Sequence, residues 1–197
     1  MTRLVNILSL KVAGLFFLVA AGCVEGGSYE DILKQELARG VSHDSLFYGL
    51  SFNMTWEEFY DHSFEMNQKG IFFQNGMNLE VQIRLEEGFK HPVILNFFPV
   101  SDVSNLINGI DGKFQYQNWA PFNDTFSGRA LEKELARNLE KWYGGRAFMQ
   151  IPHPQKYWEH ALVKIDGNRQ ITLMRAFDDS YVEVKFEDLY GKCEQEY

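Results

Sequence analysis

The feature that most constrains the fold is a change of hydrophobic period that occurs twice along the chain. Apolar residues recur at helical spacing from Trp56 to Gln68, and they alternate with polar residues after Gly70. A second helical stretch, from Ser127 to Tyr143, ends at Gly144 and is again followed by strand-like segments. Because strands follow one another without intervening helices, the pattern predicts antiparallel meanders and the α+β class rather than a parallel sheet.

Local signals set the expected boundaries. Thr55 and Glu58 fit a capping box at the start of the helix over 56 to 68, and a further helix is expected from Tyr29 to Arg39, ending at Gly40. Two hairpins are expected, at Asn75-Gly76 and at 166 to 168. The expected strands cover residues 71 to 74, 79 to 85, 93 to 98 (between Pro92 and Pro99), 112 to 118, 146 to 150, 158 to 165, 169 to 176 and 181 to 186.

The helix over 127 to 143 is expected to be amphipathic, with one apolar stripe and one solvated face. The stripe consists of Leu131, Leu135, Leu139 and Trp142. The face expected in solvent consists of Glu132, Lys133, Glu134, Arg137, Glu140 and Lys141. Helices of this kind lie on an antiparallel sheet, and the order of segments allows two tandem units, each a helix followed by a meander of three or four strands.

The first 22 residues have the order of an export signal. Arg3 and Lys11 supply the basic part, and the uncharged apolar stretch from Val12 to Ala21 is too short to span a membrane, which takes about 20 apolar residues. Cys23 follows, and the residues before it resemble the lipobox of bacterial lipoproteins, although Ala20 stands where a branched residue is usual. We therefore expect Cys23 to carry a lipid anchor of palmitate type, in the cell envelope.

A second cleavage mode stays open, because Ala20 and Gly22 also fit the small-x-small rule of ordinary secretory signals. That mode would give a soluble periplasmic or secreted protein with a free Cys23, which could form a disulfide with Cys193. Acylation excludes this disulfide and leaves Cys193 as a single exposed thiol. Val24 lacks the Asp that marks retention in the inner membrane in some bacteria, so the outer membrane is expected.

These observations divide the chain as follows. Residues 1–22 are the expected signal peptide, 23–27 a tether, and 28–197 a single α+β domain with possible subunits 28–118 and 119–197. About 174 residues after Cys23 suffice for one domain with a hydrophobic core. The net charge is −8, and loss of Arg3 and Lys11 with the signal would leave it near −10. An acidic chain is not expected to bind nucleic acid or anionic lipid.

A family resemblance begins at Gly49 and continues through the opening of the helix at Trp56. The stretch Gly49 to Phe59 resembles the helix opening of small envelope lipoproteins of the SmpA/OmlA type and of β-lactamase-inhibitor-like domains, with Asn53 in place of the family's glycine. The resemblance covers about a dozen residues. It implies a helix-on-sheet domain that binds other proteins in the periplasm or assists outer-membrane assembly, and it carries over no contact residues.

Two sequence clusters suggest catalytic or metal chemistry, and both have a simpler interpretation. Glu58 and His62 lie four residues apart on a helix and could face a metal ion, but polar residues are common on such a face. The segment 42 to 45 holds Ser, His and Asp, yet a catalytic triad converges in space rather than along the chain. We expect this segment to form a turn, and we expect no metal site and no cofactor.

The chain holds a second group of candidates in its aromatic loops, since 15% of its residues are aromatic. A binding rim is conceivable that combines stacking faces with polar groups, as sugar and peptide sites need. Its members are Trp119, Phe122, His153, Tyr157 and Trp158. Packing in the core is the alternative for most of these rings.

Two classes of function follow. The first is an anchored envelope lipoprotein with a non-catalytic binding or assembly role towards a protein, peptide or glycan. The second is a small periplasmic hydrolase, which would need Glu58, His62 and His153 to converge in a cleft.

Overall fold

The computed structural model describes residues 27 to 75, 80 to 101 and 103 to 190. The expected signal peptide, Cys23 and Cys193 lie outside these residues. The helices are α1 (Tyr29–Ala38), α2 (Trp56–Gln68), the 3-10 helix η1 (Asp124–Phe126) and α3 (Gly128–Tyr143). The strands are β1 (Phe73–Gln74), β2 (Val81–Leu85), β3 (Val93–Ser101), β4 (Ile107–Tyr116), β5 (Met149–Pro152), β6 (His160–Asp166), β7 (Arg169–Arg175) and β8 (Val182–Asp188). Within the described ranges, no helix has the length and apolar character needed to cross a membrane.

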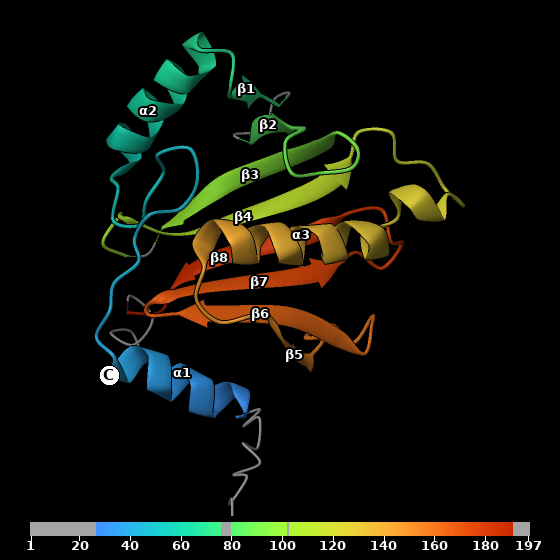
Figure 1. The fold of residues 1–197 in the computed structure, drawn as a ribbon. Helices are drawn as coiled ribbons and strands as arrows, with labels where there is room; N and C mark the ends of the chain where they lie inside the picture. Colours follow the sequence, from blue (N-terminus) through green and yellow to red (C-terminus); the bar gives the residue numbers. More distant parts are fainter. Residues whose placement is uncertain (1–26, 76–79, 102, 191–197) are drawn as a thin grey trace, which may run out of the picture.

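All eight strands form one antiparallel sheet in the order β1-β2-β3-β4-β8-β7-β6-β5. Each half is a four-strand meander preceded by a helix, α2 in the first half and α3 in the second, and the two last strands pair with each other through Ile110 and Phe186. The α+β class with helices packed on an antiparallel sheet is therefore confirmed. Figure 1 shows α2 beside the β1 end of the sheet and α1 beside the β6 end.

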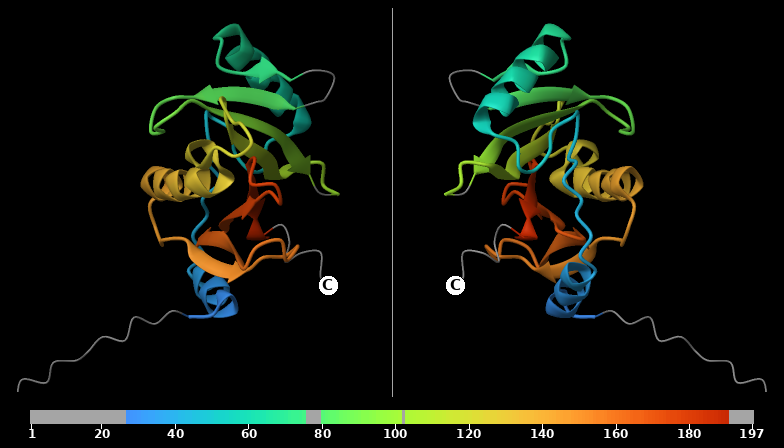
Figure 2. Two further views of the ribbon diagram at one scale, coloured as in Figure 1. Left: turned by 90° about the vertical axis from the view of Figure 1, so that its right-hand side faces the viewer. Right: turned by 90° about the vertical axis from the view of Figure 1, so that its left-hand side faces the viewer.

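The main core lies between α3 and the sheet. Leu131, Leu135 and Leu139 on α3 are fully buried against apolar side chains of the central strands, such as Phe97 and Phe186. Side chains in a strand alternate between faces, so Val163 and Ile165 of β6 point away from α3 and form a second, smaller cluster with α1. The side views in Figure 2 show α3 and the strands as separate layers, with α1 at the far end.

Both capping boxes that start the first two helices form. Thr55 Oγ1 accepts from the Glu58 N–H at 3.2 Å while the Glu58 carboxylate accepts from the Thr55 N–H at 2.8 Å, and α2 has the expected bounds. Ser28 and Asp31 make the equivalent box at α1. The 166 to 168 hairpin forms as expected, with Asp166 paired to Arg169, whereas the turn expected at Asn75-Gly76 extends outside the described residues.

The expectation that Pro99 ends its strand is wrong. Pro99 is buried inside β3 and pairs with Ile110 of β4. The last described pair between β2 and β3 joins Val81 to Phe97. No described β2 residue therefore lies opposite Pro99 to accept a hydrogen bond from a backbone N–H there. Proline is tolerated at such a place because its missing donor leaves no ladder bond unmade.

The face of α3 that we expected in solvent is partly buried, and the apolar stripe that we expected to pack on the sheet is partly exposed. Glu132 and Glu134 are buried, whereas Trp142 is 49% exposed. Glu132 faces Arg175 of β7 at 3.6 Å, and the Glu134 carboxylate accepts from the Lys90 N–H at 3.3 Å. Helical spacing alone could not show these polar partners on the neighbouring segments.

Candidate functional site

A pocket opens between the C-terminal half of α3, the loop from β2 to β3, and the segment 46 to 50, which we call the arch. Its volume is about 930 Å³. The floor is apolar and consists of buried side chains from the arch, the sheet and α3, namely Leu46, Leu95, Phe114, Leu139 and Phe186. Charged side chains of both signs surround the mouth together with two aromatic side chains. The charged ones are Arg84, Glu86, Glu87 and Lys141, and the aromatic ones are Tyr48 and Trp142.

The arch is a tight reversal held by backbone bonds. The Leu46 N–H donates to the Leu50 carbonyl at 2.9 Å, and the reversal requires positive φ at Tyr48 (50°) and Gly49 (84°). Positive φ is costly for a tyrosine, so outside contacts must hold the arch. Two such contacts exist: Tyr143 of α3 donates to the Leu46 carbonyl at 3.0 Å, and His62 Nε2 lies 2.7 Å from the Tyr48 carbonyl.

His62 therefore has a structural role rather than the metal-binding role considered from the sequence. Its ring packs directly over Gly49, where an added Cβ would lie 2.9 Å from the ring. Glu58, the other candidate ligand, is occupied by the α2 capping box. No group of three or more His, Cys, Asp and Glu side chains in the described ranges could hold a metal ion.

The opposite wall of the pocket is the β2 to β3 loop, which α3 also holds. Asn138 Nδ2 donates to the Gly88 carbonyl at 2.8 Å, and the rings of Phe89 and Trp142 meet edge to face with centroids 6.1 Å apart. Burial raises the pKa of Tyr48 at the mouth, and the charge of Glu87 adds to this effect. Tyr48 therefore stays a neutral hydrogen-bonding group, suited to the rim of an apolar pocket.

The structure brings together three of the five residues expected in the aromatic rim. His153 and Tyr157 rings lie 5.9 Å apart, and Trp158 follows in the same loop, where its indole N–H donates to the Ala176 carbonyl at 3.1 Å. Phe122 lies fully in solvent on the separate loop between β4 and α3, which also carries Trp119. Binding at this rim stays a prediction.

Beneath the rim lies a buried polar group that the sequence did not indicate. The Arg175 guanidinium packs over the Trp158 ring at 4.1 Å and lies 3.6 Å from Glu132 and 3.5 Å from Asp179. Burial raises the pKa of Glu132 even though Arg175 opposes this, and burial lowers the pKa of His153. Glu132, Arg175 and Asp179 thus meet, and Asp179 also lines a hollow of about 570 Å³ beside the start of α3.

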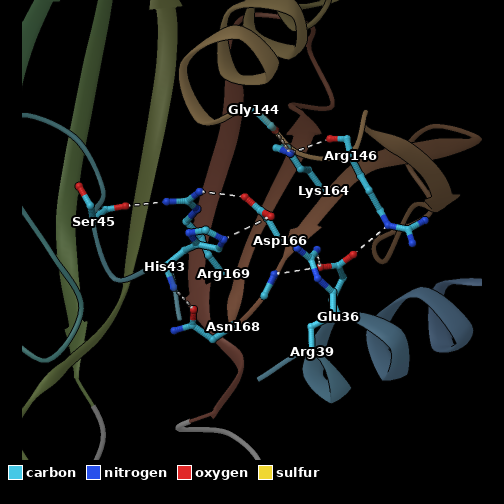
Figure 3. Close-up of polar contacts among 11 residues, drawn as sticks. Glu36, Arg39, His43, Ser45, Gly144, Arg146, Lys164, Asp166, Asn168 and Arg169 are labelled. Atoms are coloured by element: carbon cyan, nitrogen blue, oxygen red, sulfur yellow. Dashed lines mark hydrogen bonds and ion pairs between the residues drawn. The ribbon is translucent and has the colours of Figure 1, made fainter. Parts of the chain in front are cut away.

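A second buried polar network, drawn in Figure 3, joins α1 to the β6 to β7 hairpin. Glu36 of α1 pairs with Arg146 at 2.8 Å and accepts from the Gly167 N–H at 3.2 Å. Burial alone would raise the pKa of Glu36, but the hydrogen bonds from Gly167, Arg146 and Arg39 outweigh it and the pKa lies below its ordinary value. Lys164 donates to the carbonyls of Gly144 and Arg146.

The segment 42 to 45 belongs to this network and forms no turn, so that expectation is wrong. It is extended, and Ser45 makes a β-bridge with Ser51. His43 Nε2 lies 3.5 Å from Asp166, which also pairs with Arg169 at 3.3 Å. The hydroxyl of Ser42 donates to Asp44 at 2.7 Å rather than to the histidine, so the contacts are those of a structural network, not of a catalytic triad.

The residues proposed for a hydrolase do not converge. Glu58 and His62 lie on α2, and His153 follows β5, which is the opposite edge of the sheet from β1. Comparison with known protein families, curated proteins and solved structures finds no match for this chain. The resemblance to SmpA/OmlA-type lipoproteins therefore stays a prediction.

Proposed function

We propose that this protein is a lipoprotein of the bacterial cell envelope, anchored through Cys23, that binds an apolar segment of another envelope protein in the pocket between α3 and the arch. The observation that supports binding is the pocket itself. Its volume of about 930 Å³ is of the size that ligand sites have, and its floor is aliphatic and aromatic.

The mouth favours a protein segment over a glycan. A glycan needs many hydrogen-bonding groups along its whole length, whereas here the floor is apolar, and the side chains of Asn138 and Tyr143 in the lining already donate to the Gly88 and Leu46 carbonyls. An apolar side chain would fill the floor, while Arg84, Lys141 and Glu87 would pair with the polar backbone and charged neighbours of the bound segment. The outer membrane is the expected destination of the anchor.

The anchor is tested by changing its acceptor. In Cys23→Ala we expect metabolic labelling with a fatty acid to be lost and the protein to leave the membrane fraction. An extracytoplasmic soluble form in the wild type would contradict acylation and support ordinary secretory cleavage. Unchanged membrane association of Cys23→Ala would also contradict anchoring through an acylated Cys23.

The pocket is tested by placing a photoreactive amino acid at its mouth. Trp142 is 49% exposed there, and Tyr157, which is 51% exposed on the aromatic rim, gives a matched control position. We expect envelope proteins to crosslink to position 142 at least about fivefold more than to position 157, because a bound segment excludes water only at the pocket. Equal crosslinking at both positions, or more at 157, would favour the rim instead.

A further inference from the structure

A smaller hollow lies at the other side of the first meander, between the start of α2 and the end of β3. Its volume is about 260 Å³, and it is separate from the pocket between α3 and the arch. Trp56, Phe59 and Tyr60 of α2 line it together with Phe98 and Pro99 of β3 and with Glu80, which precedes β2. Four aromatic side chains from two elements and one carboxylate thus line one space.

The α2 rings that line this hollow contact one another. Trp56 and Tyr60 have centroids 5.8 Å apart and are tilted by 34°. The indole N–H of Trp56 donates to Ser101 Oγ at 3.2 Å, which fixes the ring. Tyr60 and Phe98 are 50% and 40% exposed, so part of each ring is open to a ligand. The faces of such rings carry negative potential and attract cations.

Among the described residues that line the hollow, Glu80 is the one charged side chain, whereas Lys113 and Lys185 line an adjoining hollow that shares Glu80 and Phe98. Asn75 Nδ2 donates to Glu80 Oε2 at 3.2 Å and so orients the carboxylate. Glu57 and Asp61 of α2 lie beside Trp56 and Tyr60 in the chain, and none of the described residues that line the hollow is basic. A neutral apolar occupant would leave this negative field unused, whereas a cation would be stabilised by both the rings and the carboxylate.

We propose that this hollow binds the guanidinium group of an arginine side chain on a partner protein. A guanidinium is planar and less strongly hydrated than an ammonium, stacks on aromatic faces, and forms two parallel hydrogen bonds to one carboxylate. Tyr60 and Trp56 supply the faces, and Glu80 supplies the carboxylate.

We assign the cation to a protein rather than to a lipid headgroup, and this assignment rests on the proposed anchor. The α1 helix begins only six residues after Cys23, and it packs on β6, near one edge of the sheet. The hollow is lined by residues of α2, of β3 and by Glu80 before β2, and Figure 1 shows β2 and β3 near the other edge of the sheet. An eight-strand sheet is roughly 34 Å across in the direction of its hydrogen bonds, which would place the hollow away from the membrane.

The test is a titration of the full chain, purified in mild detergent and labelled with ¹⁵N at its four tryptophans. The probe is a capped Gly-Arg-Gly tripeptide, and its matched control contains citrulline, which has the same shape without the charge. We expect the Trp56 indole N–H signal, assigned with Trp56→Phe, to shift saturably with the arginine peptide. The citrulline peptide should bind at least about fivefold more weakly.

Variants locate the site. Tyr60→Leu and Glu80→Gln should each weaken binding about fivefold, because each removes one source of attraction for the cation. Phe64→Leu is the control, since Phe64 is 65% exposed on the same helix but does not line this hollow, and it should change binding less than about twofold. Equal binding of both peptides, or equal losses in Phe64→Leu and Tyr60→Leu, would overturn the proposal.

One further measurement separates the two sources of the cation. The full chain is mixed with phosphatidylcholine vesicles. If Tyr60→Leu abolishes its binding to the vesicles, the cation comes from a lipid headgroup and the proposal of an arginine on a partner protein is overturned. If Tyr60→Leu leaves vesicle binding unchanged, the result supports the partner protein. The titration does not depend on acylation, so wild-type protein found outside the membrane fraction would refute the proposed anchor without changing this result.

Discussion

Arg169→Met should lower the free energy of unfolding by about 3 to 5 kcal/mol, because it leaves a buried carboxylate without its charged partner. The Arg169 side chain is 5% exposed, donates to the Ser45 carbonyl at 2.7 Å, pairs with Asp166 at 3.3 Å and lies over the Tyr143 ring at 4.3 Å. Urea unfolding followed by circular dichroism measures this loss.

Two further variants show whether the pair causes the loss. The double variant Asp166→Asn with Arg169→Met removes both charges and should recover part of the loss, since the unpaired charge is gone. Arg129→Met removes an exposed arginine at the start of α3 and should change stability by less than about 0.5 kcal/mol. Equal losses in the single and double variants would show that the Arg169 contacts to Ser45 and Tyr143, rather than the ion pair, dominate.

Gly167→Ala should also destabilise strongly, by about 3 kcal/mol, because it combines backbone strain with a clash. Gly167 has φ of +58°, and its Cβ would run into the backbone carbonyl of Val41. The substitution would push the segment after α1 away from the hairpin and weaken the bond from the Gly167 N–H to Glu36. Urea unfolding and hydrogen exchange of the α1 amides measure the two effects.

Gly40→Ala is the matched control for this prediction. Gly40 has φ of +63°, but nothing lies within 4 Å of its Cβ position. Gly40→Ala should lower the free energy of unfolding by about 1 to 2 kcal/mol, which is the strain of an alanine with positive φ. It should leave the hydrogen exchange of the amides in the body of α1 little changed. Similar losses for both variants would mean that strain, and not the contact with Val41, makes Gly167 necessary.

Much of the fold could be predicted because local signals and period agree. The capping box at Thr55 and Glu58 fixed the start of α2, and the alternation of apolar residues after it indicated a meander. The prediction that Pro99 ends its strand failed because a proline breaks the ladder only where a neighbouring strand needs the missing N–H. Whether it does depends on how far the neighbouring strand extends. That length is a property of the sheet, not of the local sequence.

The candidate sites were much less predictable from the sequence. The pocket takes residues from the arch, from the β2 to β3 loop and from α3, and only the strand order brings these segments together. The arch gave one usable signal, an apolar run interrupted by Gly49. Glu132 and Arg175 carried none, since each is an ordinary charged residue until the sheet places one opposite the other.

The pairing of β4 with β8 has a consequence for how the chain folds. Ile110 and Phe186 lie far apart in sequence, so this ladder must close a long loop, and pairings of this kind form slowly. Until β8 arrives, the first meander has β4 as an unpaired edge strand, with a row of free backbone groups able to join another chain. The centre of the finished sheet is therefore the aggregation-prone edge of the half-folded protein, and a newly made chain would need that edge shielded until its second half is present.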